Sequence, residues 1–208
     1  MSPAEDYFVV VEPDIGSSSQ EDVGANIATF QVLHPRDVNL VQEEVAALAE
    51  ADLPEDVYGL ALADIYIRED LLADAIDTLE PLVSAGSELF EVYQTLGDLY
   101  RYVGLNLLAE ARYEQAITLA TANQDIEGRS ATQAGLAEVK VMLAQPEQVA
   151  IDLLTQALAG YEATLTGYEA TVLEAEEELE EEVKKALEEE LLLQIQAVQE
   201  RLNELTGV

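Results

Sequence analysis

The 208-residue chain contains no cysteine and one histidine, His34. Without cysteine it forms no disulfide, no thiolate nucleophile and no zinc–thiolate site. His34 precedes Pro35 at the end of a predicted strand, and the pattern supplies no nucleophile or carboxylate partner for it. We therefore interpret His34 as a boundary residue, and we expect the chain to be no enzyme and to need no cofactor.

Long apolar runs are also missing. No stretch approaches the ~18 residues that a membrane-spanning helix needs. Residues 1–6 lack the basic start and the apolar core of a signal peptide. The sequence therefore predicts no membrane span. As given, the chain is expected in the cytoplasm, or in the periplasm or envelope if a targeting segment is missing from it, so the compartment stays open.

Basic residues are scarce. Nine Lys and Arg stand against 43 Asp and Glu, which gives a formal net charge of −34. Nucleic acids require clustered Lys and Arg, and anionic membrane surfaces attract polybasic segments, so both are excluded as partners. Repulsion among so many carboxylates favours a soluble, extended molecule over a compact sphere.

A repeated pattern of small and large apolar residues is present instead. Leu96, Gly97 and Tyr100 share one face of a predicted helix, and Gly97 lets a second helix approach closely. The same order recurs 34 residues earlier and 40 to 41 residues later. The three sets are Leu62, Ala63, Tyr66, Ala75, Leu79 and Leu82; Leu96, Gly97, Tyr100, Ala109, Tyr113 and Ala116; and Leu136, Ala137, Ala150, Leu154 and Ala157. Because one such helical hairpin cannot bury its apolar face alone, we expect a stack of them.

This pattern resembles the tetratricopeptide repeat (TPR) family, whose period is about 34 residues. The resemblance covers roughly residues 54–160 and implies a scaffold that binds other proteins. The third copy departs from the family pattern, since its preceding connection is longer and Lys140 replaces the aromatic residue. Helices are predicted at residues 55–68, 71–84, 88–103, 106–122, 129–144 and 147–160, after a first helix that Pro35 opens.

Two β-rich runs, residues 7–11 and 28–33, predict an N-terminal hairpin with a polar tip. A lone two-stranded hairpin is marginal in water. A hairpin followed by a helix and TPR-like repeats is similar to a group of cyanobacterial repeat proteins. In that group the strands end an immunoglobulin-like β domain, which implies that this hairpin is the remnant of such a domain.

Residues 161–205 predict one long acidic helix with a coiled-coil-like apolar seam. The seam contains Tyr161, Leu165, Tyr168, Val172, Ala175, Leu179, Val183, Leu187, Leu191, Ile195, Val198, Leu202 and Leu205. It pairs with a second copy or a partner helix, or it folds back as a cap on the repeats. Because its glutamate faces repel one another, self-pairing should increase as the pH falls. The glutamate clusters lack the ordered loop of a calcium site, so we expect no metal there.

In TPR proteins the first helix of each repeat lines a ligand groove. The resemblance places the groove at Leu60, Asp64, Ile67 and Arg68, at Gln94, Asp98, Arg101 and Tyr102, and at Glu138, with Val57, Glu91, Ala131, Ala134, Val141 and Met142 beside them. The Lys and Asn residues with which chaperone-binding members clamp a peptide carboxylate are missing from these positions. We expect a neutral or basic extended segment, anchored by Leu60 and Tyr102. The alternative is that these side chains are merely solvated and that the repeats pack against the chain's own tail.

The sequence thus predicts a mainly α protein. It consists of a hairpin (residues 1–34), a helix with three TPR-like hairpins forming an α-solenoid (residues 35–160), and a long acidic helix (residues 161–208). The expected function is that of a non-catalytic scaffold or adaptor in a bacterial cell, with a protein or peptide partner whose identity stays open. The alternatives are a structural module that assembles into a homo-oligomer through residues 161–205, and an accessory region of a larger enzyme or signalling protein.

Overall fold

The computed structural model describes residues 6–10, 27–31, 35–174 and 181–207. The chain divides into two compact units, Met1–Asp52 and Leu53–Val208, and each is described by itself. The domain boundaries expected after residues 34 and 160 stay predictions. Within the described residues, no helix combines the length and the apolar character that crossing a membrane requires.

The first unit contains two short strands and a helix. Strands β1 (Asp6–Val10) and β2 (Ile27–Gln31) pair antiparallel, with Tyr7 opposite Phe30. Helix α1 (Pro35–Ala49) follows and buries Val41. The polar tip of the predicted hairpin lies outside the described residues.

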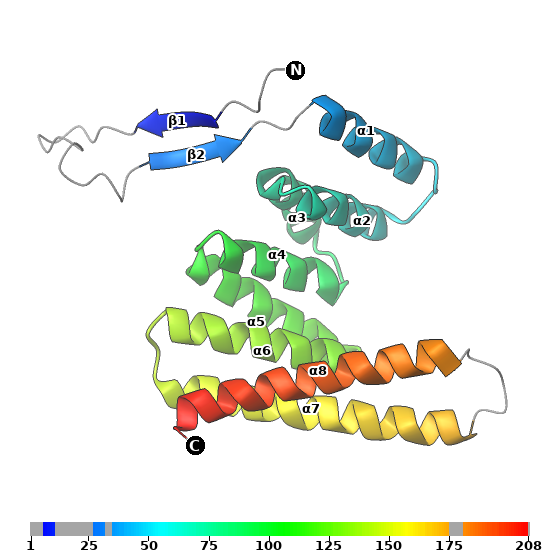
Figure 1. Cartoon of the computed structure of the whole chain (residues 1–208), viewed down its shortest axis with the longest axis vertical. Coiled ribbons are helices and arrows are strands. Elements are labelled where there is room, and N and C mark those ends of the chain that lie inside the picture. The colour runs from blue at the N-terminus through cyan, green and yellow to red at the C-terminus, as the bar shows by residue number, and fades with distance from the viewer. Residues whose placement is uncertain (1–5, 11–26, 32–34, 175–180, 208) are drawn as a thin grey trace, which may run out of the picture. The chain divides into compact units, whose positions relative to one another are not determined.

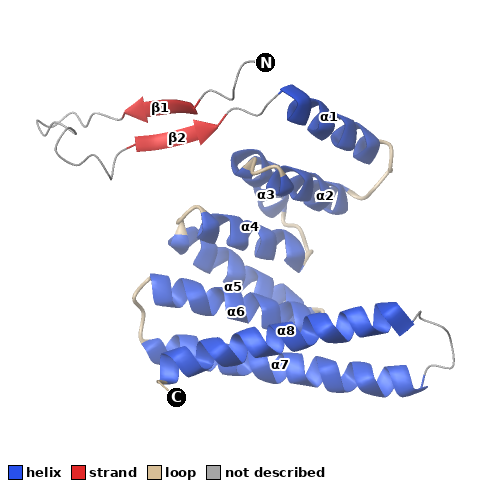
Figure 2. Ribbon diagram, in the orientation of Figure 1, coloured by secondary structure: helices blue, strands red, loops and turns tan. Residues whose placement is uncertain are grey.

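The second unit is a stack of helical hairpins (Figures 1 and 2). Its helices are α2 (Glu55–Arg68), α3 (Leu72–Ala85), α4 (Phe90–Tyr102), α5 (Asn106–Ala122), α6 (Ile126–Met142), α7 (Glu147–Glu174) and α8 (Glu181–Thr206). Each helix contacts the next along the chain, and the first helices of the repeats also contact one another, α2 with α4 and α4 with α6. This TPR-like arrangement confirms the predicted stack.

The turn inside each hairpin has the same backbone in all three repeats. Asp70, Gly104 and Ala144 occupy equivalent positions, with φ angles of 58°, 80° and 51°. This left-handed conformation suits glycine and is unfavourable for a residue that has a Cβ atom. The three repeats therefore share a turn conformation that favours glycine, and only the second repeat has glycine at that position.

Small residues lie where the helices of a hairpin cross, as the repeat pattern predicts. Ala63, Gly97 and Ala137 are all buried. Ala63 shares a buried cluster with Leu79, and Ala137 shares another with Leu154. Each repeat therefore opposes a small residue on its first helix with a large one on its second.

The second repeat has the smallest residue opposite the largest. The Tyr113 side chain is fully buried, and a Cβ atom placed on Gly97 would lie 2.9 Å from its Cδ1 atom. A Cβ atom on Gly135 of α6 would lie 3.0 Å from its Cζ atom. The ring thus fills the space that two glycines leave between α4 and α6, and its hydroxyl donates a hydrogen bond to Asp98 Oδ1 at 2.5 Å.

The prediction of one long helix over residues 161–205 is wrong. Helix α7 continues from the third repeat to Glu174, and α8 runs back along α7 (Figure 1). This packing buries Tyr161, Leu191, Ile195 and Val198, which a single projecting helix would leave in water. Because each large apolar side chain gains ~1.5–3 kcal/mol on burial, the folded-back arrangement is strongly favoured.

Candidate functional site

The first helices of all three repeats converge on one cavity of about 670 Å³. It is lined by Ile67, Asp70 and Leu72 from the first repeat, by Thr95, Asp98, Leu99, Arg101 and Tyr102 from the second, and by Met142 from the third. The cavity lies at the carboxyl ends of α2, α4 and α6, where their side chains meet across the stack. We call this cavity the groove cavity.

Five of the residues proposed from the sequence line the groove cavity, namely Ile67, Asp98, Arg101, Tyr102 and, from the flanking groove positions, Met142. Sequence reasoning missed Asp70, Leu72, Thr95 and Leu99. Leu72 belongs to a second helix and Asp70 to a turn, and the family pattern assigns the groove to first helices only. The turn geometry shared by the three repeats brings these two residues to the groove.

The rim of the groove cavity is apolar and open to solvent. The Tyr102 side chain is 75% exposed and that of Met142 is 52% exposed. The turn after Tyr102 exposes further apolar side chains at Val103 and Leu105, and the start of α5 exposes Leu107 and Leu108. At the equivalent positions of the first repeat the chain has Glu69, Leu71, Ala73 and Asp74. This edge is therefore more apolar in the second repeat than in the first, and exposed apolar patches of this kind mark interaction sites.

Asp98 has a structural role as well as a place in the groove cavity. Its carboxylate accepts the hydrogen bond from Tyr113, and Oδ1 lies 3.7 Å from Arg101 Nη2. Partial burial raises the pKa of Asp98, although the hydrogen bond from Tyr113 and the charge of Arg101 act in the opposite direction. The Tyr113 hydroxyl thus bonds one of the two Asp98 carboxylate oxygens, both of which the sequence interpretation had treated as available to a ligand.

The remaining first- and second-repeat residues proposed for the groove lie elsewhere on the first helices. Leu60 is half-buried and packs against the core, so it offers little apolar surface to a ligand. Asp64 and Arg68 form an exposed ion pair one helical turn apart, with Nε and Oδ2 separated by 3.3 Å. Such pairs contribute little to stability and leave both groups accessible. Gln94 is half-buried and is absent from the lining of the groove cavity.

Helix α8 covers the groove face of the third repeat. Glu138 accepts two hydrogen bonds from Arg201 of α8, at 2.8 Å from Nε to Oε1 and at 3.1 Å from Nη2 to Oε2. The neighbouring groove positions Ala131, Ala134 and Val141 pack against the cluster that contains Leu191 and Ile195 of α8. Packing against the chain's own tail, the alternative weighed from the sequence, therefore applies to the third repeat.

A second set of charges joins α5 to α6 on another face. Lys140 Nζ bonds Glu110 and lies 3.3 Å from Glu114 Oε1, while Gln145 donates to Glu110 at 2.8 Å. The hydrogen bond from Lys140 lowers the pKa of Glu110. Lys140 stands where the other repeats have Tyr66 and Tyr100, so an ion pair replaces an aromatic contact there. Among the described residues, no three acidic or histidine side chains gather as a metal site would require.

No protein-family model matches the chain, and no curated protein matches it. Among solved structures, a crystal structure of MamA protein is similar with a TM-score of 0.50 and 21% identity, over 81% of this chain and 86% of that one. Another MamA crystal structure has a TM-score of 0.48 and 18% identity, over 83% and 95% of the two chains. TPR-like repeats of a putative kinesin light chain from Podosopora anserina have a TM-score of 0.49 and 22% identity, over 80% and 87%.

These likenesses concern the fold. The described helices form TPR-like repeats, an arrangement of stacked helical hairpins. At such low identity nothing about ligands or partners carries over to this chain.

Proposed function

We propose that this chain is a non-catalytic adaptor that binds an extended, neutral or basic segment of a partner protein in the groove cavity. The observation that carries the proposal is the convergence of Ile67, Tyr102 and Met142, one from each repeat, around a single cavity with an apolar rim. An exposed tyrosine beside a cavity is the kind of residue that dominates binding energy at protein interfaces.

The charge of the chain supports a neutral or basic partner. A net charge of −34 repels acidic segments and speeds the approach of basic ones. Asp70 lies in the lining of the groove cavity, and the exposed Asp64 is on the first helix of the first repeat. Since exposed charges are screened by salt, they should affect the association rate more than the final affinity.

The covered third repeat limits the length of the bound segment. Because α8 occupies Glu138 and the apolar positions around it, the open groove extends over the first two repeats and ends at Met142. We infer that the partner contributes a short segment with one or two apolar anchors rather than a long helix that spans the whole stack.

The experiment is a screen of short synthetic peptides of basic, neutral and acidic character against the full chain, followed by calorimetric titration of the best binders. Tyr102→Ala should weaken binding at least ~10-fold, which corresponds to about 1.4 kcal/mol. The matched control is Leu193→Ala, because Leu193 is 67% exposed and lies on α8, outside the groove cavity and its apolar rim. Binders that are predominantly acidic, or that lose no affinity with Tyr102→Ala, would refute the proposal.

Assembly through the C-terminal helix is the second candidate function. From Leu191 onward the apolar seam of α8 is buried against α7 and α6, so a homo-oligomer would have to use Leu187 or residues outside the seam. Leu192 and Leu193 are exposed on α8 and could supply such a contact. Light scattering distinguishes the candidates, since a monomer at high concentration favours the adaptor. A dimer that Leu193→Asp dissociates favours assembly.

A further inference from the structure

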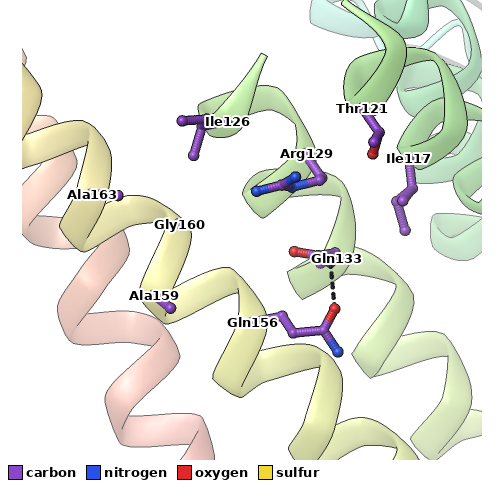
Figure 3. A pocket seen from close by; sticks show the side chains of 9 residues that line it. All are labelled: Ile117, Thr121, Ile126, Arg129, Gln133, Gln156, Ala159, Gly160 and Ala163. Atoms are coloured by element: carbon purple, nitrogen blue, oxygen red, sulfur yellow. Dashed lines mark hydrogen bonds between the residues drawn. The ribbon is translucent and has the colours of Figure 1, made fainter. Parts of the chain in front are cut away.

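A second cavity lies between α5, α6 and α7, and it shares no residue with the groove cavity. It measures about 550 Å³, and Figure 3 shows its lining. Ile117, Ile126, Ala159 and Ala163 supply apolar walls, and Arg129 and Gln133 of α6 supply polar groups. We call it the Arg129 cavity. Its volume falls within the range of small-molecule sites, ~300–1,000 Å³.

Gln133 has an unmet hydrogen-bond acceptor in this cavity. The residue is only 6% exposed, and its Nε2 donates to Gln156 Oε1 at 3.0 Å. Its Oε1 is buried and, within the described part of the chain, accepts no hydrogen bond. Figure 3 shows this oxygen directed away from the Gln156 side chain, toward the part of α7 that contains Gly160. A buried polar atom without a partner costs ~1–3 kcal/mol, and native proteins seldom leave one unsatisfied.

Arg129 lies one helical turn before Gln133 and extends toward α7 in the same cavity (Figure 3). Within the described residues it forms no ion pair, although the chain carries 43 acidic residues. Other cations of the repeats and the tail are paired, for example Arg112 with Glu80 and Arg201 with Glu138. An arginine that stays unpaired in so acidic a chain, beside an unmet acceptor, points to a ligand from outside the chain.

The equivalent position in the second repeat shows what is particular to Gln133. Gln133 occupies the position equivalent to Tyr93, 40 residues earlier. The Tyr93 side chain is buried, and its hydroxyl donates to the Ser87 carbonyl oxygen at 2.9 Å. The second repeat has a cavity of about 440 Å³ at the equivalent place, lined by Tyr93, Gln115 and Thr118 among others. What distinguishes the third repeat is therefore the amide, whose Oε1 has no partner within the described residues, where the second repeat has a hydroxyl that donates to the backbone.

From these groups we propose that the Arg129 cavity binds a small organic acid that carries an N–H or O–H donor on the carbon next to its carboxylate and a short apolar side chain. The guanidinium pairs with the carboxylate, which it recognises with two parallel hydrogen bonds. Gln133 Oε1 accepts the neighbouring donor. The apolar walls receive the side chain.

The spacing of the two polar groups fits this ligand class. Residues four apart on a helix are neighbours on one face, separated by a rise of about 6 Å. A carboxylate and a donor on adjacent carbons can reach both groups at ordinary hydrogen-bond lengths of about 2.9 Å. A dicarboxylate would place a second charge against the unmet acceptor, so it fits less well.

The test is calorimetric titration of the full chain with N-acetylleucine, with leucic acid and with the neutral N-acetylleucinamide. We expect both acids to bind and to raise the unfolding temperature, because they bind only the folded chain. The amide should bind at least ~10-fold more weakly, since it lacks the charge that Arg129 pairs with. The proposal would be overturned if one of the two acids failed to bind, or if acid and amide bound equally well.

Two variants place the binding in this cavity. Arg129→Met should reduce the affinity at least ~10-fold. Gln133→Tyr installs the residue of the second repeat, removes the unmet acceptor and should also weaken binding at least ~10-fold. Arg112→Met is the matched control, because Arg112 lies on α5 outside the cavity and its loss changes the net charge equally. If Gln133→Tyr fails to fold, the affinity of the Arg129→Met variant for the acids is the deciding measurement. An affinity equal to that of the parent chain contradicts the proposal.

The same chemistry also occurs at the carboxyl end of a peptide. A titration with acetylated Gly-Gly-Leu, as free acid and as amide, separates the two sources. Tighter binding of the peptide acid than of N-acetylleucine assigns the cavity to a protein terminus, and the reverse assigns it to a free metabolite. Either result supports the ligand class, whereas equal binding of peptide acid and peptide amide contradicts it.

Discussion

The contact between Gly97 and Tyr113 provides the sharpest test of the packing. Gly97→Ala adds a methyl group 2.9 Å from Tyr113 Cδ1 and 3.0 Å from Cε1, which is closer than carbon atoms pack without strain. The ring cannot move aside easily, because Gly135 contacts its other end and Asp98 holds its hydroxyl. The methyl group must therefore displace backbone or ring.

The expected energies follow from this geometry. Overpacking of a core costs ~1–3 kcal/mol, and the better helix propensity of alanine returns about 1 kcal/mol. Gly97→Ala should therefore lower the free energy of unfolding by up to ~2 kcal/mol. Tyr113→Leu should lower it by ~2–4 kcal/mol, since it leaves a cavity and removes the hydrogen bond to Asp98.

The most informative of these variants combines Gly97→Ala with Tyr113→Leu. It recreates the pairing of the other repeats, Ala63 with Leu79 and Ala137 with Leu154, so the added methyl group occupies space that the tyrosine ring has left. The loss in the double variant should be smaller than the sum of the single losses by ~1–3 kcal/mol.

The assay is urea unfolding of the four proteins at neutral pH. Gly167→Ala is the control, because a Cβ atom there meets no atom within 4 Å. It should gain the full ~1 kcal/mol of helix propensity. Additive losses, or stabilisation by Gly97→Ala as large as that by Gly167→Ala, would refute the close crossing of α4 and α5.

Three further changes test individual features. Ala144→Gly should stabilise the chain by ~1 kcal/mol in urea unfolding, because φ at this residue is 51° and glycine adopts that conformation without strain; destabilisation would contradict the shared turn geometry. Burial raises the pKa of Asp98, so its contribution to stability is present at acidic pH and is lost as the pH rises through the raised value. Asp98→Asn should accordingly be slightly more stable than the parent at neutral pH, and the difference should be small because the Asp98 side chain is 48% exposed. The difference in the free energy of unfolding should vanish below pH ~4. Burial, with the nearby charge of Glu127, raises the pKa of Tyr161 to about 12. Because the unfolded chain releases this proton near pH ~10, stability should fall between the two values, and Tyr161→Phe should reduce that fall; thermal melts that decline equally in both proteins would contradict the assignment.

The stacked hairpins could be predicted because their determinants are local. Ala63, Gly97 and Ala137 recur at fixed spacing, and the volume at each position decides how closely two adjacent helices cross. The number and order of the helices between residues 55 and 147 follow from that repeat. The helices expected to start at residues 88 and 129 start at Phe90 and Ile126 instead. Helix termini depend on weaker local preferences than helix interiors do, so they are predicted less precisely.

The reversal of the tail could not be predicted in the same way. The spacing of Leu191, Ile195 and Val198 is identical whether the seam meets α7, a second copy or a partner helix. The contact that decides the matter joins Glu138 to Arg201, 63 residues apart, and nothing in the local pattern links them. The unmet acceptor of Gln133 is likewise notable only beside its counterpart Tyr93, whose hydroxyl forms a hydrogen bond.

The groove was predicted in part for a related reason. The family pattern identifies which face of each first helix turns toward the groove, and Ile67, Arg101 and Tyr102 from that face line one cavity. The pattern contains no information about what covers that face. We therefore propose partner binding at the first two repeats, with Met142 at the limit and α8 beyond it.

The most direct test of this assignment is the mapping of a bound peptide by amide chemical shifts on the isotope-labelled full chain. We expect the shifts to concentrate around Ile67, Thr95 and Tyr102, and the amides of α6 beneath α8 to change little. Shifts confined to α7 and α8, or spread along α6 with loss of the α8 signals, would contradict it.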